Sequence, residues 1–260
     1  MTYNFNQRMR KILSIALPSG GNSLLDIVNI AIGMYFIAHI SADVEVTKHN
    51  IVALGLGMSC WMFLLALTTS FSVGTNAQVS RAFGERNYTK MQAVLSTMSI
   101  GVVFFSIPIY LLAYNFNGLY FDWMGVGEET KALGMLYLGW IFCSIPALLL
   151  KTIFISALAS TGDTKSVFFI KIISTSLNIA LNFMLIFGVH SLHIPPLGIA
   201  GAGISNVMIS YFEGIILFGI LCGLHRHLKI SLVFKWRILL FGLRIGLPSG
   251  IERGLTILSL

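Results

Sequence analysis

Long apolar stretches separated by short polar breaks run along the whole chain. A helix needs about 20 predominantly apolar residues to cross the hydrocarbon core of a bilayer. Seven stretches reach that length, and each is predicted to be a membrane-spanning helix. They cover Ile12–Ala38, Ile51–Val73, Met91–Asn115, Ala132–Ala157, Val167–Val189, Leu197–Gly223 and Ile238 to the last residue. The pattern therefore predicts an all-α, polytopic membrane protein.

A six-residue motif opens the first stretch and returns in the last one. Residues 15–20 read Ile-Ala-Leu-Pro-Ser-Gly, and residues 245–250 read Ile-Gly-Leu-Pro-Ser-Gly. Six predicted spans separate the copies, so both would enter the membrane from the same side. We interpret residues 1–230 as a six-helix transmembrane lobe and residues 231–260 as the start of a second lobe, the two being parallel repeats. On this interpretation the rest of the second lobe is a missing partner.

The composition agrees with a protein whose main partner is the lipid bilayer. Hydrophobic residues make up 56% of the chain, charged residues only 10%, and the mean hydropathy is +0.83. Soluble domains carry about 25% charged residues. The net charge of +7 does not indicate a nucleic-acid partner, because the basic residues form short clusters between apolar stretches rather than one basic face.

The distribution of these basic residues predicts the orientation. If the N-terminus is cytoplasmic, 12 of the 17 Lys and Arg residues fall on the cytoplasmic side, and only Lys48 and Lys131 on the other. The cytoplasmic set is Arg8, Arg10, Lys11, Arg81, Arg86, Lys90, Lys165, Lys171, Arg226, Lys229, Lys235 and Arg237. Cytoplasmic loops of membrane proteins are enriched in Lys and Arg, so we expect a multi-pass protein with a cytoplasmic N-terminus.

Acidic residues inside the predicted spans are candidate functional groups, because an ionisable side chain in hydrocarbon is costly unless it is paired or hydrated. Asp26 lies midway along the first span, and no basic residue lies near it in the sequence. It is a candidate carboxylate for binding H⁺ or Na⁺ in a water-filled cavity, and the alternative is a polar group satisfied by a neighbouring helix. Glu252 lies in the seventh span beside Arg253, and the role of Glu213 in the sixth span stays open.

Other polar and helix-bending residues inside the spans are further candidates. Asn178 and Asn182 are four residues apart, on one face of a helix, where their amide oxygens could bind Na⁺. Hydrogen bonding between helices is the alternative, and the spacing alone favours neither. Pro18 and Pro248 interrupt the first and last spans, where a proline frees a backbone carbonyl and permits bending. Both are candidate hinges, although static helix bundles also contain such prolines.

No enzyme signature occurs in the chain. It contains no phosphate-binding loop, no HExxH zinc motif and no Gly-x-Ser-x-Gly nucleophile motif. The histidines lie mostly at the ends of spans, and the three cysteines have no metal-type spacing. We therefore expect neither an enzyme nor a cofactor, and we expect that energy for transport would come from an ion gradient.

Five segments have an order and spacing that is specific when they are taken together. They are Ala16-Leu17-Pro18 with Asn22, Leu24 and Leu25; residues 78–84; residues 159–165; Asn178 and Asn182 with residues 186–188; and residues 197–203. Through these segments the chain resembles the multidrug and toxic compound extrusion (MATE) family of efflux transporters, over essentially its whole length. The resemblance implies two six-helix bundles around a V-shaped cavity in the bacterial inner membrane. It also implies alternating access coupled to Na⁺ or H⁺, and a small-molecule substrate.

The resemblance also implies where the coupling cation binds. In many members an acidic residue of the first helix combines with polar residues of the fifth helix, and Asn178 and Asn182 match the fifth-helix positions. The acidic position falls at Gly33, so we expect Asp26, two turns earlier on nearly the same face, to substitute for it. The family further places polar site residues near Asn206 and, in the second lobe, near Glu252.

Three functions are compatible with these observations. The leading hypothesis is an antiporter that exports drugs or other amphipathic, organic cationic compounds against Na⁺ or H⁺. A flippase for lipid-linked oligosaccharides, from the same superfamily, would need several cationic residues in its cavity to hold pyrophosphate. A seven-helix receptor is a third alternative. A retinal pump is excluded as a fourth, because the last span, residues 238–260, contains no lysine for a Schiff base.

Overall fold

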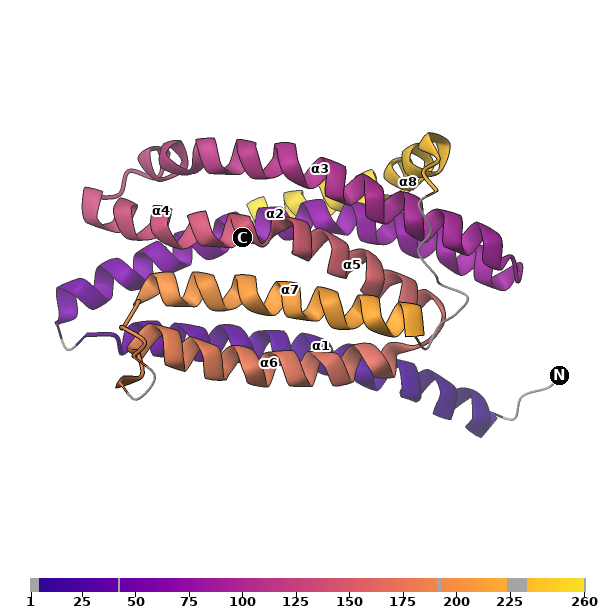
Figure 1. Ribbon diagram of the computed structural model, residues 1–260, viewed down its shortest axis with the longest axis horizontal. Coiled ribbons are helices and arrows are strands. Elements are labelled where there is room, and N and C mark those ends of the chain that lie inside the picture. Colours follow the sequence, from indigo (N-terminus) through magenta and orange to yellow (C-terminus); the bar gives the residue numbers. More distant parts are fainter. Residues whose placement is uncertain (1–4, 42, 191–192, 224–232, 260) are drawn as a thin grey trace.

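The structure, a computed structural model, describes residues 5–41, 43–190, 193–223 and 233–259. Two of the basic residues used for the predicted orientation, Arg226 and Lys229, lie outside this part of the chain. The described part is almost entirely helical (Figure 1). Its helices are α1 (Phe5–Ala38), α2 (Val44–Gly84), α3 (Tyr88–Trp123), α4 (Glu128–Cys143), α5 (Ile145–Ser160), α6 (Thr164–Phe187), α7 (Ile199–Gly223) and α8 (Trp236–Leu258).

The predicted spans coincide with these helices. Five of them are long and apolar enough to cross a bilayer (α1 from Ala16, α2, α3, α6 and α7), and the bent pair α4–α5 passes the same test as one unit. The prediction of an all-α, polytopic membrane protein is confirmed. The seventh predicted span is helical as α8, but Arg244, Glu252 and Arg253 interrupt its apolar sequence, and α8 is not among the helices that pass.

The fourth predicted span is not one continuous helix, which corrects the expectation for residues 132–157. It is broken at Ser144, and α4 and α5 are bent by 47° relative to each other. Pro146 lies in the first turn of α5, where its missing N–H and its ring are tolerated, whereas in the middle of a continuous helix they would remove one backbone hydrogen bond. Ser144 is buried, and its hydroxyl donates to the Ile141 carbonyl at 2.7 Å.

The helices of the lobe pack in two groups. Helices α1, α6 and α7 lie side by side in Figure 1, and α2 to α5 pack together; α7 packs against both groups, through α6 on one side and through α4 and α5 on the other. Large apolar side chains such as Phe121, Phe142 and Leu149 fill the core. Others, including Phe104 and Ile215 at 70% exposure each, point outwards, as expected for a surface that faces lipid chains. The outer surface of the lobe is therefore largely apolar, and polar side chains inside the lobe are exceptions that need a partner.

The turns between helices alternate between the two ends of the bundle (Figure 1). The start of α1 shares its end with the α2–α3 and α5–α6 turns. In the α2–α3 turn, Arg81 and Lys90 contact Glu85 at 2.9 and 3.1 Å, and these cations hold the pKa of the Glu85 carboxyl below its usual value. Lys171, which was also counted with this end, lies two turns inside α6 and not in the α5–α6 turn.

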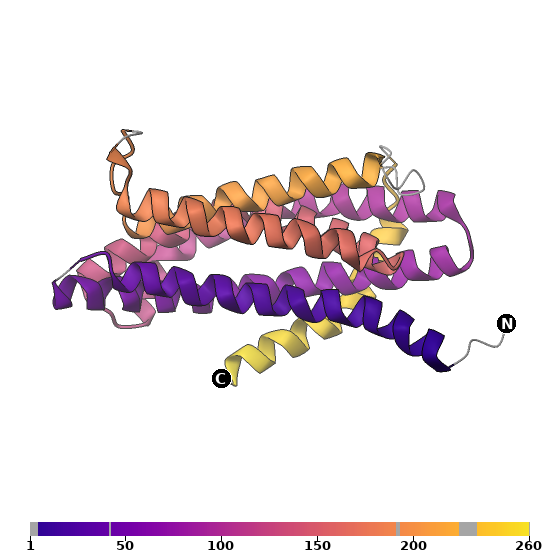
Figure 2. The same ribbon diagram turned by 90° about the horizontal axis from the view of Figure 1, so that it is seen from below.

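Helix α8 crosses the lobe obliquely and packs on α2 (Figure 2). The backbones of α2 and α8 come into close contact at this crossing. A Cβ atom added to Gly246 would lie 1.7 Å from the Ser70 carbonyl oxygen, and one added to Gly74 would lie 2.2 Å from the Gly242 carbonyl oxygen. Small residues permit such close approach of two helices. The side chain of Gln78 adds a hydrogen bond to the Ile238 carbonyl at 3.3 Å.

Candidate functional site

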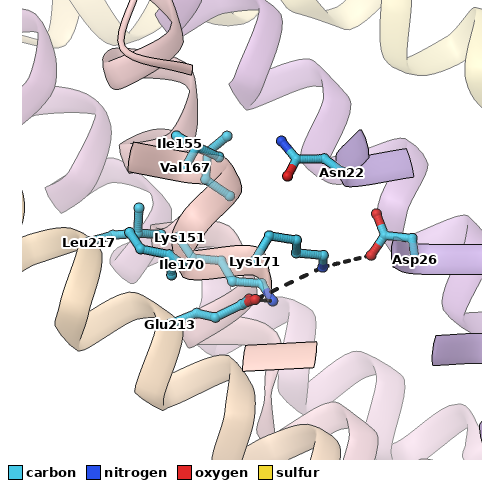
Figure 3. Close-up of a pocket in the computed structure, with 9 residues that line it drawn as sticks. All are labelled: Asn22, Asp26, Lys151, Ile155, Val167, Ile170, Lys171, Glu213 and Leu217. Carbon is cyan, nitrogen blue, oxygen red and sulfur yellow. Dashed lines mark hydrogen bonds and ion pairs between the residues drawn. The ribbon is translucent and has the colours of Figure 1, made fainter. Parts of the chain in front are cut away.

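A cavity of about 210 Å³ lies between α1, α5, α6 and α7 (Figure 3). Its volume is enough for several water molecules. Four of its side chains carry charge, and all four come from the bodies of predicted spans rather than from turns. The lining residues are Asn22, Asp26, Lys151, Ile155, Val167, Ile170, Lys171, Glu213 and Leu217.

The four charged side chains form one connected ionic cluster. Lys171 Nζ lies 2.6 Å from Asp26 Oδ1 and 3.9 Å from Glu213 Oε1, so it stands between two carboxylates (Figure 3). The second oxygen of Glu213 accepts from Lys151 Nζ at 2.5 Å. Ser174 donates to Glu213 Oε1, also at 2.5 Å. Two carboxylates and two ammonium groups balance each other, so the cluster has no net charge.

The two carboxylates differ in exposure and in the number of their partners. The Glu213 side chain is only 6% exposed and is held by residues of α5 and α6. The Asp26 side chain is 57% exposed and, among the residues that the structure describes, has one ion-pair partner, Lys171. Glu213 therefore fixes the lysines in place, whereas Asp26 is the carboxylate that a ligand or a proton can reach.

Helix periodicity and one glycine place these groups together. Asn22 and Asp26 are one turn apart on α1, and Lys171 and Ser174 are one turn apart on α6, so each pair shares a face. At Gly21 the ring of Phe168 comes within 2.5 Å of the position that a Cβ atom would occupy. The missing side chain lets α1 approach α6 closely enough for Asp26 to reach Lys171.

Asp26 is not isolated, contrary to what its sequence surroundings indicate. A lysine far away in the sequence neutralises it, because α1 and α6 are neighbours in the fold. Asp26 also pairs with the helix turn that contains Lys171, and Asn178 lies seven residues further along α6, about 10 Å away along the axis. At Gly33 a Cβ atom would have no neighbour within 4 Å. The expected grouping of Asp26 with the two asparagines is therefore absent from this structure.

Asn178 and Asn182 form a separate polar cluster inside the lobe. Both are buried, at 2% and 4% exposure. Asn182 donates to the Asn178 oxygen at 2.9 Å, and Ser205 of α7 donates to the Asn182 oxygen. Each amide oxygen thus already accepts a hydrogen bond, and within the described residues the Asn178 amide nitrogen has no partner. Their use as Na⁺ ligands stays a prediction, and it would require one or both bonds to be replaced.

The remaining candidate residues lie away from the cavity. Asn206 is half-buried on α7, and its amide donates to the Ala202 carbonyl of its own helix at 3.0 Å. Glu252 is exposed on α8. Pro18 and Pro248 lie inside helices that continue past them. The structure does not group these four with Asp26, and their roles in cation binding or bending stay predictions.

Lys151, Lys171 and Glu213 belong to the site although sequence reasoning did not assign them to it. A signal for them was present, because each is an ionisable residue within or beside an apolar stretch, where an unpaired charge is costly. Two carboxylates and two lysines inside apolar spans indicate mutual pairing. Which carboxylate pairs with which lysine depends on how the helices pack, and that packing could not be inferred from the sequence pattern.

Comparisons with known proteins place the chain in a family. The model of the MatE family matches residues 19–184. The multidrug export protein MepA of Staphylococcus aureus (strain bovine RF122 / ET3-1) is 28% identical over 204 residues, which are 78% of this chain and 44% of MepA. The probable multidrug resistance protein NorM of Photorhabdus laumondii is 26% identical over 216 residues, 80% of this chain and 47% of NorM.

Solved transporter structures share the fold. An outward-facing MATE family transporter of the MOP superfamily matches 94% of this chain with a TM-score of 0.82 and 19% identity. A MOP superfamily transporter from Pyrococcus furiosus, whose binding pocket is described as having reverse polarity, matches 94% with a TM-score of 0.81 and 18% identity. The chain spans about half the length of these proteins, 52% in both. The sequence match over residues 19–184 shows that the chain belongs to the MatE family of multidrug and toxic compound extrusion transporters.

Proposed function

We propose that this chain forms the first lobe of an exporter of amphipathic or organic cationic compounds in the bacterial inner membrane. In this proposal the lobe works with a second lobe by alternating access, the N-terminus is cytoplasmic, and transport is driven by antiport of H⁺ or Na⁺. Asp26 is the carboxylate that takes up the coupling ion. The basic turn formed by Arg81, Arg86 and Lys90, at the same end of the bundle as the start of α1, supports the orientation.

The observation that carries this proposal is the environment of Asp26. Its carboxylate is inside a membrane-spanning helix and lines a cavity, and its side chain is more than half exposed. Ionisable residues in such positions mark ion and proton pathways in transporters. The names of the relatives MepA and NorM, both multidrug transport or resistance proteins, support a drug-like substrate.

We predict that Asp26→Asn, made in a two-lobed protein that contains this chain, reduces drug export at least tenfold. Asparagine has nearly the same size as aspartate, but it can neither be ionised nor neutralise Lys171. Expression and membrane insertion should stay near wild type, because Asp26 is largely exposed. The measurement is the accumulation of ethidium, an amphipathic cation, in a pump-deficient bacterial host, with and without Na⁺ in the medium.

Asp122→Asn serves as the matched control. Asp122 pairs with Lys131 at the opposite end of the bundle from the start of α1, and it lies outside the cavity. Its substitution should leave accumulation unchanged. Wild-type export by Asp26→Asn would remove Asp26 from the mechanism. If the wild-type protein changed the accumulation of no tested drug, that result would count against export itself.

A flippase for lipid-linked oligosaccharides is the second candidate, because Lys151 and Lys171 both line the cavity. Neither lysine was expected in the cavity from the sequence, and a flippase would need such cationic side chains there. Both, however, are neutralised by carboxylates at 2.5 and 2.6 Å, so neither offers a free positive charge for pyrophosphate. Export is therefore the favoured function. Flipping of a fluorescent lipid-linked sugar by the reconstituted protein would favour the flippase instead.

We expect the 260-residue chain by itself to transport nothing. The proposed substrate path lies between two lobes, and this chain supplies one lobe and α8. The test is ethidium efflux from cells that produce the chain alone, compared with cells that also produce a complementary second lobe. Full efflux by the chain alone would contradict the two-lobed mechanism.

A further inference from the structure

Lys171 occupies a position that the proposed function of Asp26 does not by itself explain. Its ammonium group lies between the reachable carboxylate of Asp26 and the buried carboxylate of Glu213, at 2.6 and 3.9 Å. The Lys171 side chain is 25% exposed, so the pair with Asp26 is shielded but not sealed from the cavity. A positive charge therefore already sits where a cation bound by Asp26 would have to sit.

We propose that Lys171 is a positioning residue whose tethered ammonium takes the place of Na⁺ at Asp26 and so makes H⁺ the coupling ion of this lobe. The inference rests on the proposed role of Asp26 and names the ion that this role uses. Uptake of the ion is a simple protonation: a proton from water in the cavity binds an Asp26 oxygen and gives a neutral carboxylic acid. Lys171 remains an ammonium ion throughout.

Two features of the cluster disfavour Na⁺ at this carboxylate. Hard cations are held by shells of several oxygen atoms, and the ammonium group of Lys171 blocks the Asp26 oxygen that would begin such a shell. The ammonium group repels any second positive charge, Na⁺ or H⁺, because the cluster has no net negative charge to hold it, and only the proton offsets this repulsion with a covalent bond. A proton needs no shell, because it forms a covalent bond with one oxygen.

The cluster also gives Lys171 a place to go when Asp26 is protonated. The titratable groups that line the cavity with Asp26 are Lys171 of α6, Glu213 of α7 and Lys151 of α5. Glu213 Oε1 is the nearest remaining anion, and Lys151 already holds the other oxygen of that carboxylate. Protonation of Asp26 should therefore release α1 from α6 and draw Lys171 towards α7. The contact between α1 and α6 is therefore the part of the lobe that changes when Asp26 is protonated.

The inference is tested by the binding of radioactive sodium ions to the purified protein in lipid nanodiscs. We expect no Asp26-dependent Na⁺ binding in the wild-type protein, so the wild type and Asp26→Asn should bind the same amount of Na⁺. Lys171→Gln, which removes the tethered charge, should create Asp26-dependent Na⁺ binding, and the double variant Asp26→Asn/Lys171→Gln should lose this gain. Lys171→Arg keeps the charge and should behave as wild type. Lys165→Gln, an exposed lysine on the same helix, is the matched control.

Two results would overturn the inference. One is Asp26-dependent Na⁺ binding in the wild-type protein, a measurement that does not depend on whether any lysine variant folds. The other is a Lys171→Gln protein that elutes as wild type in size-exclusion chromatography but gains no Na⁺ binding. Failure of the proposed function would look different: Asp26→Asn would then export ethidium normally, whatever ion the site binds.

Discussion

Replacing Gly246 by alanine will force α8 away from α2 and lower the apparent melting temperature of the protein by several degrees. The added Cβ would lie 1.7 Å from the Ser70 carbonyl oxygen, far inside van der Waals contact, and that oxygen belongs to the backbone of α2. Overpacking of this kind costs about 1–3 kcal/mol. For chains of 150–250 residues, each kcal/mol corresponds to about 2–4 °C. The helix propensity of alanine offsets only part of this cost.

The measurement is thermal unfolding in detergent at one fixed heating rate, because unfolding of membrane proteins is commonly irreversible and depends on the rate. The control is Gly254→Ala on the same helix, where a Cβ atom would have no neighbour within 4 Å. Gly250→Ala should fall between the two, since its clash is with the Ser70 hydroxyl, which can rotate away. Equal melting temperatures for Gly246→Ala and Gly254→Ala would show that α8 does not rest on α2 in this way.

The α2–α8 crossing also explains the single mismatch in the repeated motif. Ala16 of the first copy corresponds to Gly246 of the second. Ala16 is exposed, so a methyl group is harmless there, whereas at Gly246 the same methyl group would enter the backbone of α2. The two copies thus have the same sequence pattern and differ at the one position where the second copy, but not the first, is packed tightly.

Hydrophobic patterning predicted the fold well because a membrane protein must bury its backbone polar groups in helices. Every predicted span is helical, since no other open structure satisfies these groups in lipid. The break at Ser144 was harder to predict. A proline such as Pro18 or Pro108 lies within a continuous helix, whereas Pro146 follows a 47° bend. The outcome depends on whether neighbouring helices satisfy the freed carbonyls, and that is a property of packing.

The candidate site was predictable only in part, for a related reason. Asp26 was identified because a charge in hydrocarbon stands out in any sequence. Its partner Lys171 lies 145 residues later, within the predicted span Val167–Val189, but was counted among the basic residues that set the orientation. In the structure it lies two turns inside α6, which begins at Thr164. The predicted start of that span, Val167, differs from the start of α6 by only three residues, so the span boundary was not the obstacle. The pairing of Lys171 with Asp26 depends on how α1 packs against α6.

Glu213→Leu will destabilise the lobe by about 3–5 kcal/mol, because it leaves Lys151 buried without a counter-charge. Lys151 is 15% exposed and Glu213 6%, so solvent screens this pair little. Lys171 will be affected less, since it keeps Asp26 as a partner. The double variant Lys151→Met/Glu213→Leu should recover most of the loss, because it replaces a buried ion pair by apolar side chains of similar size.

Chemical and thermal unfolding of the single and double variants measure this difference, with Glu85→Gln as the control. Glu85 also contacts two cations, Arg81 and Lys90, but all three side chains are exposed, and the loss of such contacts should cause no measurable change. If the double variant were as unstable as Glu213→Leu alone, the cost would come from the lost Ser174 hydrogen bond and from packing. An unpaired Lys151 would then not be the cause, and the ionic cluster would not be what joins α5, α6 and α7.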